Sequence, residues 1–197
     1  MLWHKIQGAG GLVGAGGGGA VTFVDSVAGA GTISLTGVGA NDLVIYMQAQ
    51  GGNYGPGDDV PSGWTVLYEY KPDSFYVALA YAYGESSITV PINRGMLFAF
   101  SGNSTSVAPT FAFASGSSTT PDPPPLTGFN SGDGAFAGAA LDGGSSFSAG
   151  PAGYSGFTTS GRIAGSYYLS PSSTEDPGNF SGSDNTWGAF TVRIPAA

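Results

Sequence analysis

The carboxylates are the first candidates for chemistry in this chain of 197 residues. Two carboxyl groups that flank a sugar linkage can hydrolyse it, one as an acid and the other as a base or nucleophile. Most of these residues stand beside Gly or Pro, where Asp accepts hydrogen bonds from the backbone of turns. Turn formation and solvation are therefore the preferred interpretation, and a glycosidase is the alternative. The carboxylates considered are Asp58, Asp59, Glu69, Glu85, Asp142, Glu175 and Asp176.

Other catalytic motifs find little support. The chain has one histidine, His4, and no cysteine, which excludes disulfides, thiol catalysis and cysteine zinc sites. Residues Gly14–Gly19 fit G-x-G-x-x-G, but nucleotide binding requires a strand before that motif and a helix after it. Here more glycines precede it and the strand-like Val21–Val24 follows it. We expect a flexible hinge, no enzymatic activity, no cofactor and no metal.

The loop 53–59 is the sequence's best candidate for ligand contact. Tyr54 offers an aromatic ring, and Asp58 and Asp59 offer acceptors, a combination that suits the apolar face and the hydroxyls of a sugar. Asn53 completes this set. The same oxygens could hold Ca²⁺, although the regular D-x-D-x-D-G spacing is missing. An ordinary hairpin loop is the simpler interpretation.

The charge balance excludes several classes of partner. Five Lys and Arg stand against 13 Asp and Glu, for a net charge of −8. The sequence has no basic cluster that could neutralise phosphates, so we expect no nucleic acid. No apolar run approaches the roughly 20 residues of a membrane helix, and MLWHKIQG lacks the apolar region of a signal peptide. We expect neither membrane insertion nor a cleaved leader.

The pattern of apolar residues indicates strands. Glycine, at 35 residues, interrupts every candidate helical window, whereas short apolar or alternating runs bounded by turn residues are frequent. The predicted strands of the first part of the chain are Val21–Val27, Gly31–Thr36, Asp42–Gln50, Trp64–Tyr70, Phe75–Tyr83, Ser87–Ile92, Met96–Ser101 and Thr110–Ala114.

The second half of the chain repeats the first in the order of its pieces. NDLVIYMQAQGGN, VPSGWTVL, FYVALAYAYG and MLFAFSG reappear as GDGAFAGAALDGGSS, AGPAGYSGF, RIAGSYYLSP and TWGAFTVRI. Trp64 follows a Pro-x-Gly turn as Tyr154 does 90 residues later, and Leu97–Phe100 matches Trp187–Phe190 at the same offset. Equivalent bulky residues typically fill a core, so Trp64 and Tyr154 are expected to plug the ends of the fold.

This repeat predicts the architecture. Two half-units, about 20–114 and 126–197, are joined by a proline-rich connector, 115–125, that favours extended conformation. A half-unit of four or five strands exposes one apolar face, and two such units placed face to face bury both. We therefore predict an all-β, jelly-roll-like sandwich over residues 20–197, preceded by an extended glycine-rich N-terminal arm, 1–19.

The arm begins with a compact cluster that could act as an anchor. Ordering a glycine-rich segment costs about 1–2 kcal/mol of backbone entropy per residue, and this arm has too little apolar surface to fold back alone. We expect a partner to hold it, either a larger particle or a second copy of the chain that exchanges arms. The attachment residues are Leu2, Trp3, His4, Lys5 and Ile6.

Several motifs resemble small virion proteins of tailed bacteriophages, of the tail-fibre, head-fibre or decoration type. They are LWHKIQGAGG, NDLVIYMQAQGG, PSGWTVL, FYVALAYAYG and STEDPGNFSGSDNTWGAFTVRI, and the similarity covers most of the chain. The resemblance implies a protein of the particle surface, attached to other virion proteins by its N-terminus and presenting a β-rich domain outward. It transfers no catalytic residue.

The function expected from these observations is that of a virion surface fibre, spike or decoration subunit. We expect a homo-oligomer, with a trimer favoured, because exposed strand edges need cover and repeated weak sites gain effective concentration. Host-surface carbohydrate is the expected ligand. The alternatives are a capsid cement protein that staples shell subunits, and a carbohydrate-active enzyme or free lectin on a sandwich scaffold.

Overall fold

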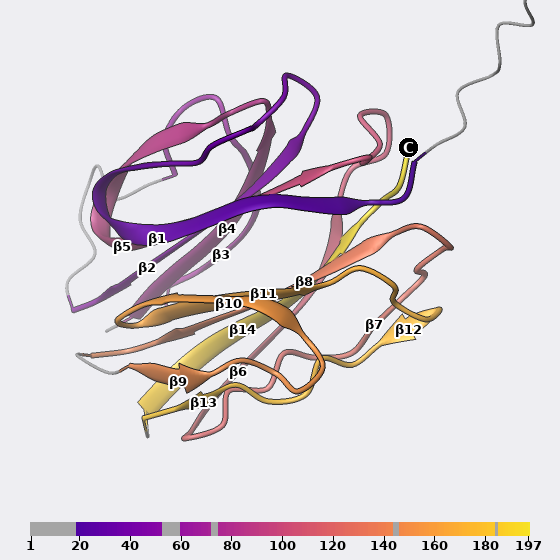
Figure 1. The fold of residues 1–197 in the computed structure, drawn as a ribbon. Helices are drawn as coiled ribbons and strands as arrows, with labels where there is room; N and C mark the ends of the chain where they lie inside the picture. The colour runs from indigo at the N-terminus through magenta and orange to yellow at the C-terminus, as the bar shows by residue number, and fades with distance from the viewer. Residues whose placement is uncertain (1–18, 53–59, 72–74, 144–145, 184) are drawn as a thin grey trace, which may run out of the picture.

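Two five-stranded sheets lie face to face in the computed structural model of the protein (Figure 1). The structure describes residues 19–52, 60–71, 75–143, 146–183 and 185–197. Within these residues every strand pairing is antiparallel and no helix occurs. The protein is an all-β sandwich, as predicted.

Each sheet takes its strands from one half of the chain. The first sheet, in the spatial order β1-β5-β2-β4-β3, contains β1 (Thr22–Ser34), β2 (Leu43–Gly51), β3 (Thr65–Tyr70), β4 (Phe75–Tyr83) and β5 (Ser87–Ser101). The second, in the order β10-β11-β8-β14-β6, contains β6 (Thr110–Ser118), β8 (Gly134–Leu141), β10 (Ser155–Ser160), β11 (Ile163–Tyr168) and β14 (Asn185–Ile194). Two short ribbons lie beside the second sheet, β7 (Leu126–Thr127) with β12 (Thr174–Glu175), and β9 (Phe147–Ala149) with β13 (Ser181–Gly182).

The two sheets share one connectivity. Counted along the chain within each sheet, the five strands lie in the order first, fifth, second, fourth, third in both. The sandwich is therefore built from two related half-units. The chain completes one sheet before it begins the other, whereas the Greek keys of a jelly roll pass between its two sheets. In this respect the connectivity differs from the expected jelly-roll-like one.

The boundary between the half-units lies earlier than predicted. Thr110–Ser118, expected to end the first half-unit and begin the connector, pairs along β14 and is the first strand of the second sheet. The rest of the connector, 119–125, packs on that sheet, because its extended backbone presents carbonyls to neighbouring donors. Thr191 Oγ1 donates to the Pro124 carbonyl over 2.5 Å. The proline-rich segment is thus part of the packed fold.

The pairing register gives residue-by-residue equivalences between the sheets. In the first sheet, one row of directly opposed residues crosses from β3 through β4 and β2 to β5 and consists of Thr65, Tyr81, Ile45 and Phe98. The equivalent row of the second sheet crosses from β10 through β11 and β8 to β14 and consists of Ser155, Tyr167, Phe136 and Val192. The predicted equivalence of Trp64 and Tyr154 fits this register. The predicted match of Leu97–Phe100 with Trp187–Phe190 is displaced by four residues, because the register makes Phe98 equivalent to Val192 and the prediction made it equivalent to Gly188.

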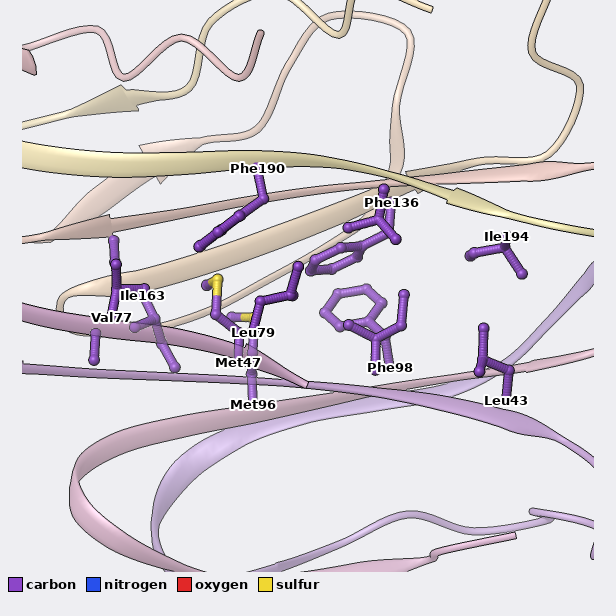
Figure 2. Packing of buried hydrophobic residues seen from close by; sticks show 14 of the residues in the cluster. Leu43, Met47, Val77, Leu79, Met96, Phe98, Phe136, Ile163, Phe190 and Ile194 are labelled. Carbon is purple, nitrogen blue, oxygen red and sulfur yellow. The ribbon is translucent and has the colours of Figure 1, made fainter. Parts of the chain in front are cut away.

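The main core lies between the two sheets. Alternate residues of a strand point to opposite faces, so each central strand contributes every second side chain to it. Figure 2 shows these side chains meeting from both sides, each exposed by 1% or less: Leu43, Met47, Val77, Leu79, Met96, Phe98, Phe136, Ile163, Phe190 and Ile194.

The sheets pack with an approximate twofold relation. The strand β2 contacts β8, its own equivalent. The edge strand β1 meets β10, where Ser26 Oγ and Thr158 Oγ1 are 2.8 Å apart. The opposite edges meet as β3 on β6, where the ring centroids of Tyr68 and Phe113 are 4.6 Å apart. The first strand of each sheet thus faces the third strand of the other, as in a symmetric homodimer.

Both outer faces are covered as well. On the first sheet, β1 and β5 curl over (Figure 1), and Ile33 joins Tyr46 in a second buried cluster. This bend needs Gly95, because a Cβ there would lie 2.7 Å from Val90 Cγ2. On the second sheet, Phe147 and Phe180 pack over a face of small residues, with ring centroids 5.6 Å apart.

Candidate functional site

The two groups of site residues predicted from the sequence lie outside the described residues. They are the N-terminal Leu2, Trp3, His4, Lys5 and Ile6, and the loop residues Asn53, Tyr54, Asp58 and Asp59. The site that the structure does describe is built from other residues.

Most of the remaining carboxylates are apart from one another and have structural surroundings. Glu69 accepts a hydrogen bond from the Tyr76 hydroxyl (2.8 Å) and pairs with Lys71 (3.2 Å). Glu85 is exposed between β4 and β5. Glu175 and Asp176 line an open cavity of about 320 Å³.

This cavity combines aromatic rings, hydroxyls and carboxylates on the second half-unit. Its walls come from the loop before β10 and from the segment that leads from β11 into β12. The side chains that carry functional groups are Tyr154, Tyr168, Ser170, Ser172, Glu175 and Asp176. Its volume is at the lower end of the range of small-molecule sites, about 300–1,000 Å³.

Local sequence positions each wall. A turn over Pro151–Tyr154 is closed by the Tyr154 N–H, which donates to the Pro151 carbonyl over 3.2 Å. Gly153 has φ = 83°, a left-handed value that favours glycine at this turn. Tyr168 ends β11 and stays 36% exposed. Glu175 is fixed by pairing of β12 with β7, where it lies opposite Leu126.

A hydrogen bond between two side chains of the cavity orients Glu175. The Tyr154 hydroxyl donates to Glu175 Oε1 over 3.2 Å. Burial, followed by the negative charge of Glu175, raises the pKa of Tyr154 far above its usual value. The phenol therefore stays a neutral donor over the physiological range, and it holds the carboxylate with its other lone pairs open to the cavity.

The two tyrosines form one aromatic wall. Their ring centroids are 5.7 Å apart and the ring planes are inclined by 32°. At this separation the rings contact each other. Together with the serines and carboxylates, the wall offers a flat apolar surface beside hydrogen-bond donors and acceptors, which suits a polar, uncharged ligand with an apolar face.

In the first sheet, aromatic side chains occupy the position equivalent to the cavity. Trp64, the equivalent of Tyr154, packs on Tyr46 with ring centroids 5.3 Å apart. The second sheet has the small Ala137 where the first has Tyr46, and there the Tyr154 ring meets Tyr168 instead. Trp64 and Tyr154 were predicted to plug the ends of the sandwich. They lie instead over the outer faces of its sheets, each partly buried.

Two consecutive tyrosines, Tyr167 and Tyr168, are the sequence feature that indicates an aromatic residue at this site. Tyr167 and Tyr168 are consecutive on a strand, so their rings must point to opposite faces. Tyr167 enters the main core, which leaves Tyr168 on the outer face. The approach of Glu175 and Asp176 could not be predicted, because it depends on the fold of the loop between β11 and β12.

Within the described part of the chain, no group of three or more His, Asp or Glu could hold a metal ion. No helix among those residues is long and apolar enough to span a membrane. No protein family, no curated protein and no solved structure matches this chain.

Proposed function

We propose that this chain is a structural protein of a tailed-bacteriophage virion, a surface fibre, spike or decoration subunit attached through Leu2–Ile6. One observation carries the proposal: the sandwich closes from Val21 onward. Val21 is 2% exposed, its N–H donates to the Gly132 carbonyl over 2.8 Å, and both sheets consist of later residues. The described core therefore uses no residue before Val21, and we assign partner binding to the aromatic and basic cluster that precedes it in sequence.

The position of the chain ends supports an attached domain. The Ala197 N–H donates to the Gly102 carbonyl over 3.0 Å, and a Cβ on Gly102 would lie 2.3 Å from the Ala20 carbonyl oxygen. The described chain thus starts and finishes at one end of the sandwich (Figure 1). A domain held through its start would direct the opposite end away from the particle.

The proposal includes a homo-oligomer, with a trimer favoured. The strands β1, β3, β6 and β10 form the borders of the two large sheets, and border strands present backbone groups to a further strand. Analytical ultracentrifugation of the full chain tests this. We expect a mass three times that of the 19.6 kDa chain, and a monomer at all concentrations would contradict it.

Deletion of residues 1–18 tests the proposed attachment. The shortened chain should fold with an unchanged melting temperature, because the core begins at Val21. In a phage that encodes the protein, it should be absent from purified particles. Normal incorporation of the shortened chain would reject attachment through this segment, and failure to fold would contradict the independence of the sandwich.

A further inference from the structure

We propose that the cavity bounded by Tyr154, Tyr168 and Glu175 binds the ring of a neutral sugar. This inference deepens the proposed function and rests on it for the source of the ligand, a host-surface carbohydrate. The cavity itself stands on its own geometry.

The aromatic wall selects a flat apolar face. The ring centroids of Tyr154 and Tyr168 are 5.7 Å apart, too close to admit a third group between them. The rings therefore act as one surface, on which the C–H face of a pyranose can pack. Tyr168 is 36% exposed, so part of its ring is accessible to a bound ligand.

The rim of the cavity supplies the complementary hydrogen bonds. Glu175 is held by the Tyr154 hydroxyl, and Asp176 lies beside it in the cavity wall. Carboxylates accept strong, charge-assisted hydrogen bonds from hydroxyl groups. Ser170 can donate or accept, and Ser172, whose hydroxyl donates to the Thr174 carbonyl over 2.5 Å, can accept. A sugar offers several hydroxyls around an apolar ring and matches both features at once.

Charge narrows the class of ligand to neutral sugars. Two carboxylates line the cavity and the chain carries a net charge of −8, which opposes sialic acids, uronic acids and phosphorylated sugars. A quaternary ammonium group prefers an aromatic cage with separate walls. The contacting rings of Tyr154 and Tyr168 form a single wall, so the geometry favours an uncharged pyranose over such a cation.

Titration of the full chain with single sugars tests the proposal. The probes are glucose, galactose, mannose and N-acetylglucosamine, each up to tens of millimolar, followed by protein NMR. Sialic acid and choline are the anionic and cationic comparisons. The diagnostic variant is Tyr168→Ala. Its matched control is Phe157→Ala, which removes a similarly exposed aromatic ring, 39% against 36%, from the same sheet but outside the cavity lining.

We expect at least one neutral sugar to bind with a millimolar dissociation constant. Tyr168→Ala should weaken binding at least tenfold, and Phe157→Ala should leave it unchanged, with both variants retaining the wild-type melting temperature. Absence of binding by all four sugars, equal binding by Tyr168→Ala, or tighter binding of choline or sialic acid would each overturn the proposal. None of these outcomes depends on attachment through residues 1–18, so the proposed function can fail independently.

Discussion

Met47 and Gly138 occupy equivalent positions in the two sheets and meet across the core. A Cβ on Gly138 would lie 3.0 Å from Met47 Sδ and 2.8 Å from Phe136 Cε1. The two residues belong to β2 and β8, the strands that contact their own equivalents at the centre of the approximate twofold relation. The Met47 side chain thus occupies core space that is free because residue 138 has no side chain. Two long side chains would not fit there.

We predict that Gly138→Ala lowers the free energy of unfolding by about 1–3 kcal/mol, because the new methyl group overpacks a filled core. Met47→Ala opens space at the same point, so Gly138→Ala should cost less in that background. Urea unfolding of the two single variants, the double variant and the wild type measures this coupling.

Gly19→Ala is the matched control for this cycle, since a Cβ at Gly19 meets nothing within 4 Å. It should change the free energy of unfolding by less than about 0.5 kcal/mol. If Gly138→Ala costs the same with and without the Met47 side chain, the two residues do not share their space as described.

A buried polar chain on the outer face of the first sheet gives a second prediction. The Tyr46 hydroxyl donates to Gln48 Oε1 over 2.6 Å, and Gln48 Nε2 donates to the Tyr76 hydroxyl over 3.1 Å. Gln48 is fully buried. Gln48→Ala should lower the free energy of unfolding by about 2–4 kcal/mol, because it removes the acceptor of a buried hydroxyl and leaves a cavity.

The control for this prediction is Gln48→Ala combined with Tyr46→Phe. Removing the hydroxyl that loses its acceptor should recover part of the stability, as judged by urea unfolding. A double variant no more stable than Gln48→Ala would show that the hydrogen bond between Tyr46 and Gln48 contributes little.

Asp133 gives a third prediction, on pH. Burial opposes ionisation of its carboxyl, but hydrogen bonds from Arg193 and from the Asn130 and Ala196 N–H groups lower its pKa below the usual 3.8. The unfolded chain therefore takes up a proton first as the pH falls. The stabilisation by Asp133 is complete above the unfolded-state pKa and is lost as the pH falls through the lower, folded-state pKa.

We expect Asp133→Asn to lower the free energy of unfolding by about 2–4 kcal/mol at pH 7, because Arg193 loses its partner. The difference from the wild type should shrink below about pH 4. Asp42→Asn is the matched control: Asp42 closes the equivalent turn of the first sheet, where the Gly39 N–H donates to it over 2.7 Å. Asp42→Asn should lower the free energy of unfolding by less than Asp133→Asn does. A deficit in Asp133→Asn that stays constant to pH 2 would contradict the explanation.

The strands were predictable where turn residues bound an uninterrupted apolar run. Phe75–Tyr83 was predicted with the bounds that β4 has, because a serine precedes it and Gly84 follows it. β1 and β5 were each predicted as two strands. Each is one strand in the structure, although the pairing between them shifts register where Gly29 lies opposite Gly95 and Gly31 lies opposite Val90.

The repeat could be predicted from the sequence. The boundary between the half-units and the alignment of Leu97–Phe100 with the second half-unit could not. Thr110–Ala114 follows the first half-unit closely in sequence, yet it pairs with β14, some eighty residues further along. Such non-local pairing leaves no periodic signal. The connector 119–125 was predicted to be a linker because prolines avoid central strands, and its carbonyls instead bond to the outer layer of the second sheet.

The cavity was the least predictable feature. Tyr154 was predicted to be a core residue by its equivalence to Trp64, but its neighbours differ between the repeats: Ala137 stands in place of Tyr46, and Tyr168 in place of Ala82. With the small residue beneath it, Tyr154 packs beside Tyr168 at a cavity instead of on a ring below. A sequence repeat shows which positions are equivalent, but the size of their neighbours decides what each position does.

The occupancy of purified phage particles by a variant with two substitutions, Trp3→Ala and Ile6→Ala, tests the central claim most directly. This variant keeps the length and glycines of the N-terminal segment and removes two of the three apolar side chains of the attachment residues Leu2–Ile6. Quantitative mass spectrometry of particles should show at least a tenfold loss of the protein relative to the wild type, while the melting temperature of the isolated chain stays unchanged. Wild-type occupancy by a folded variant would contradict attachment through these residues.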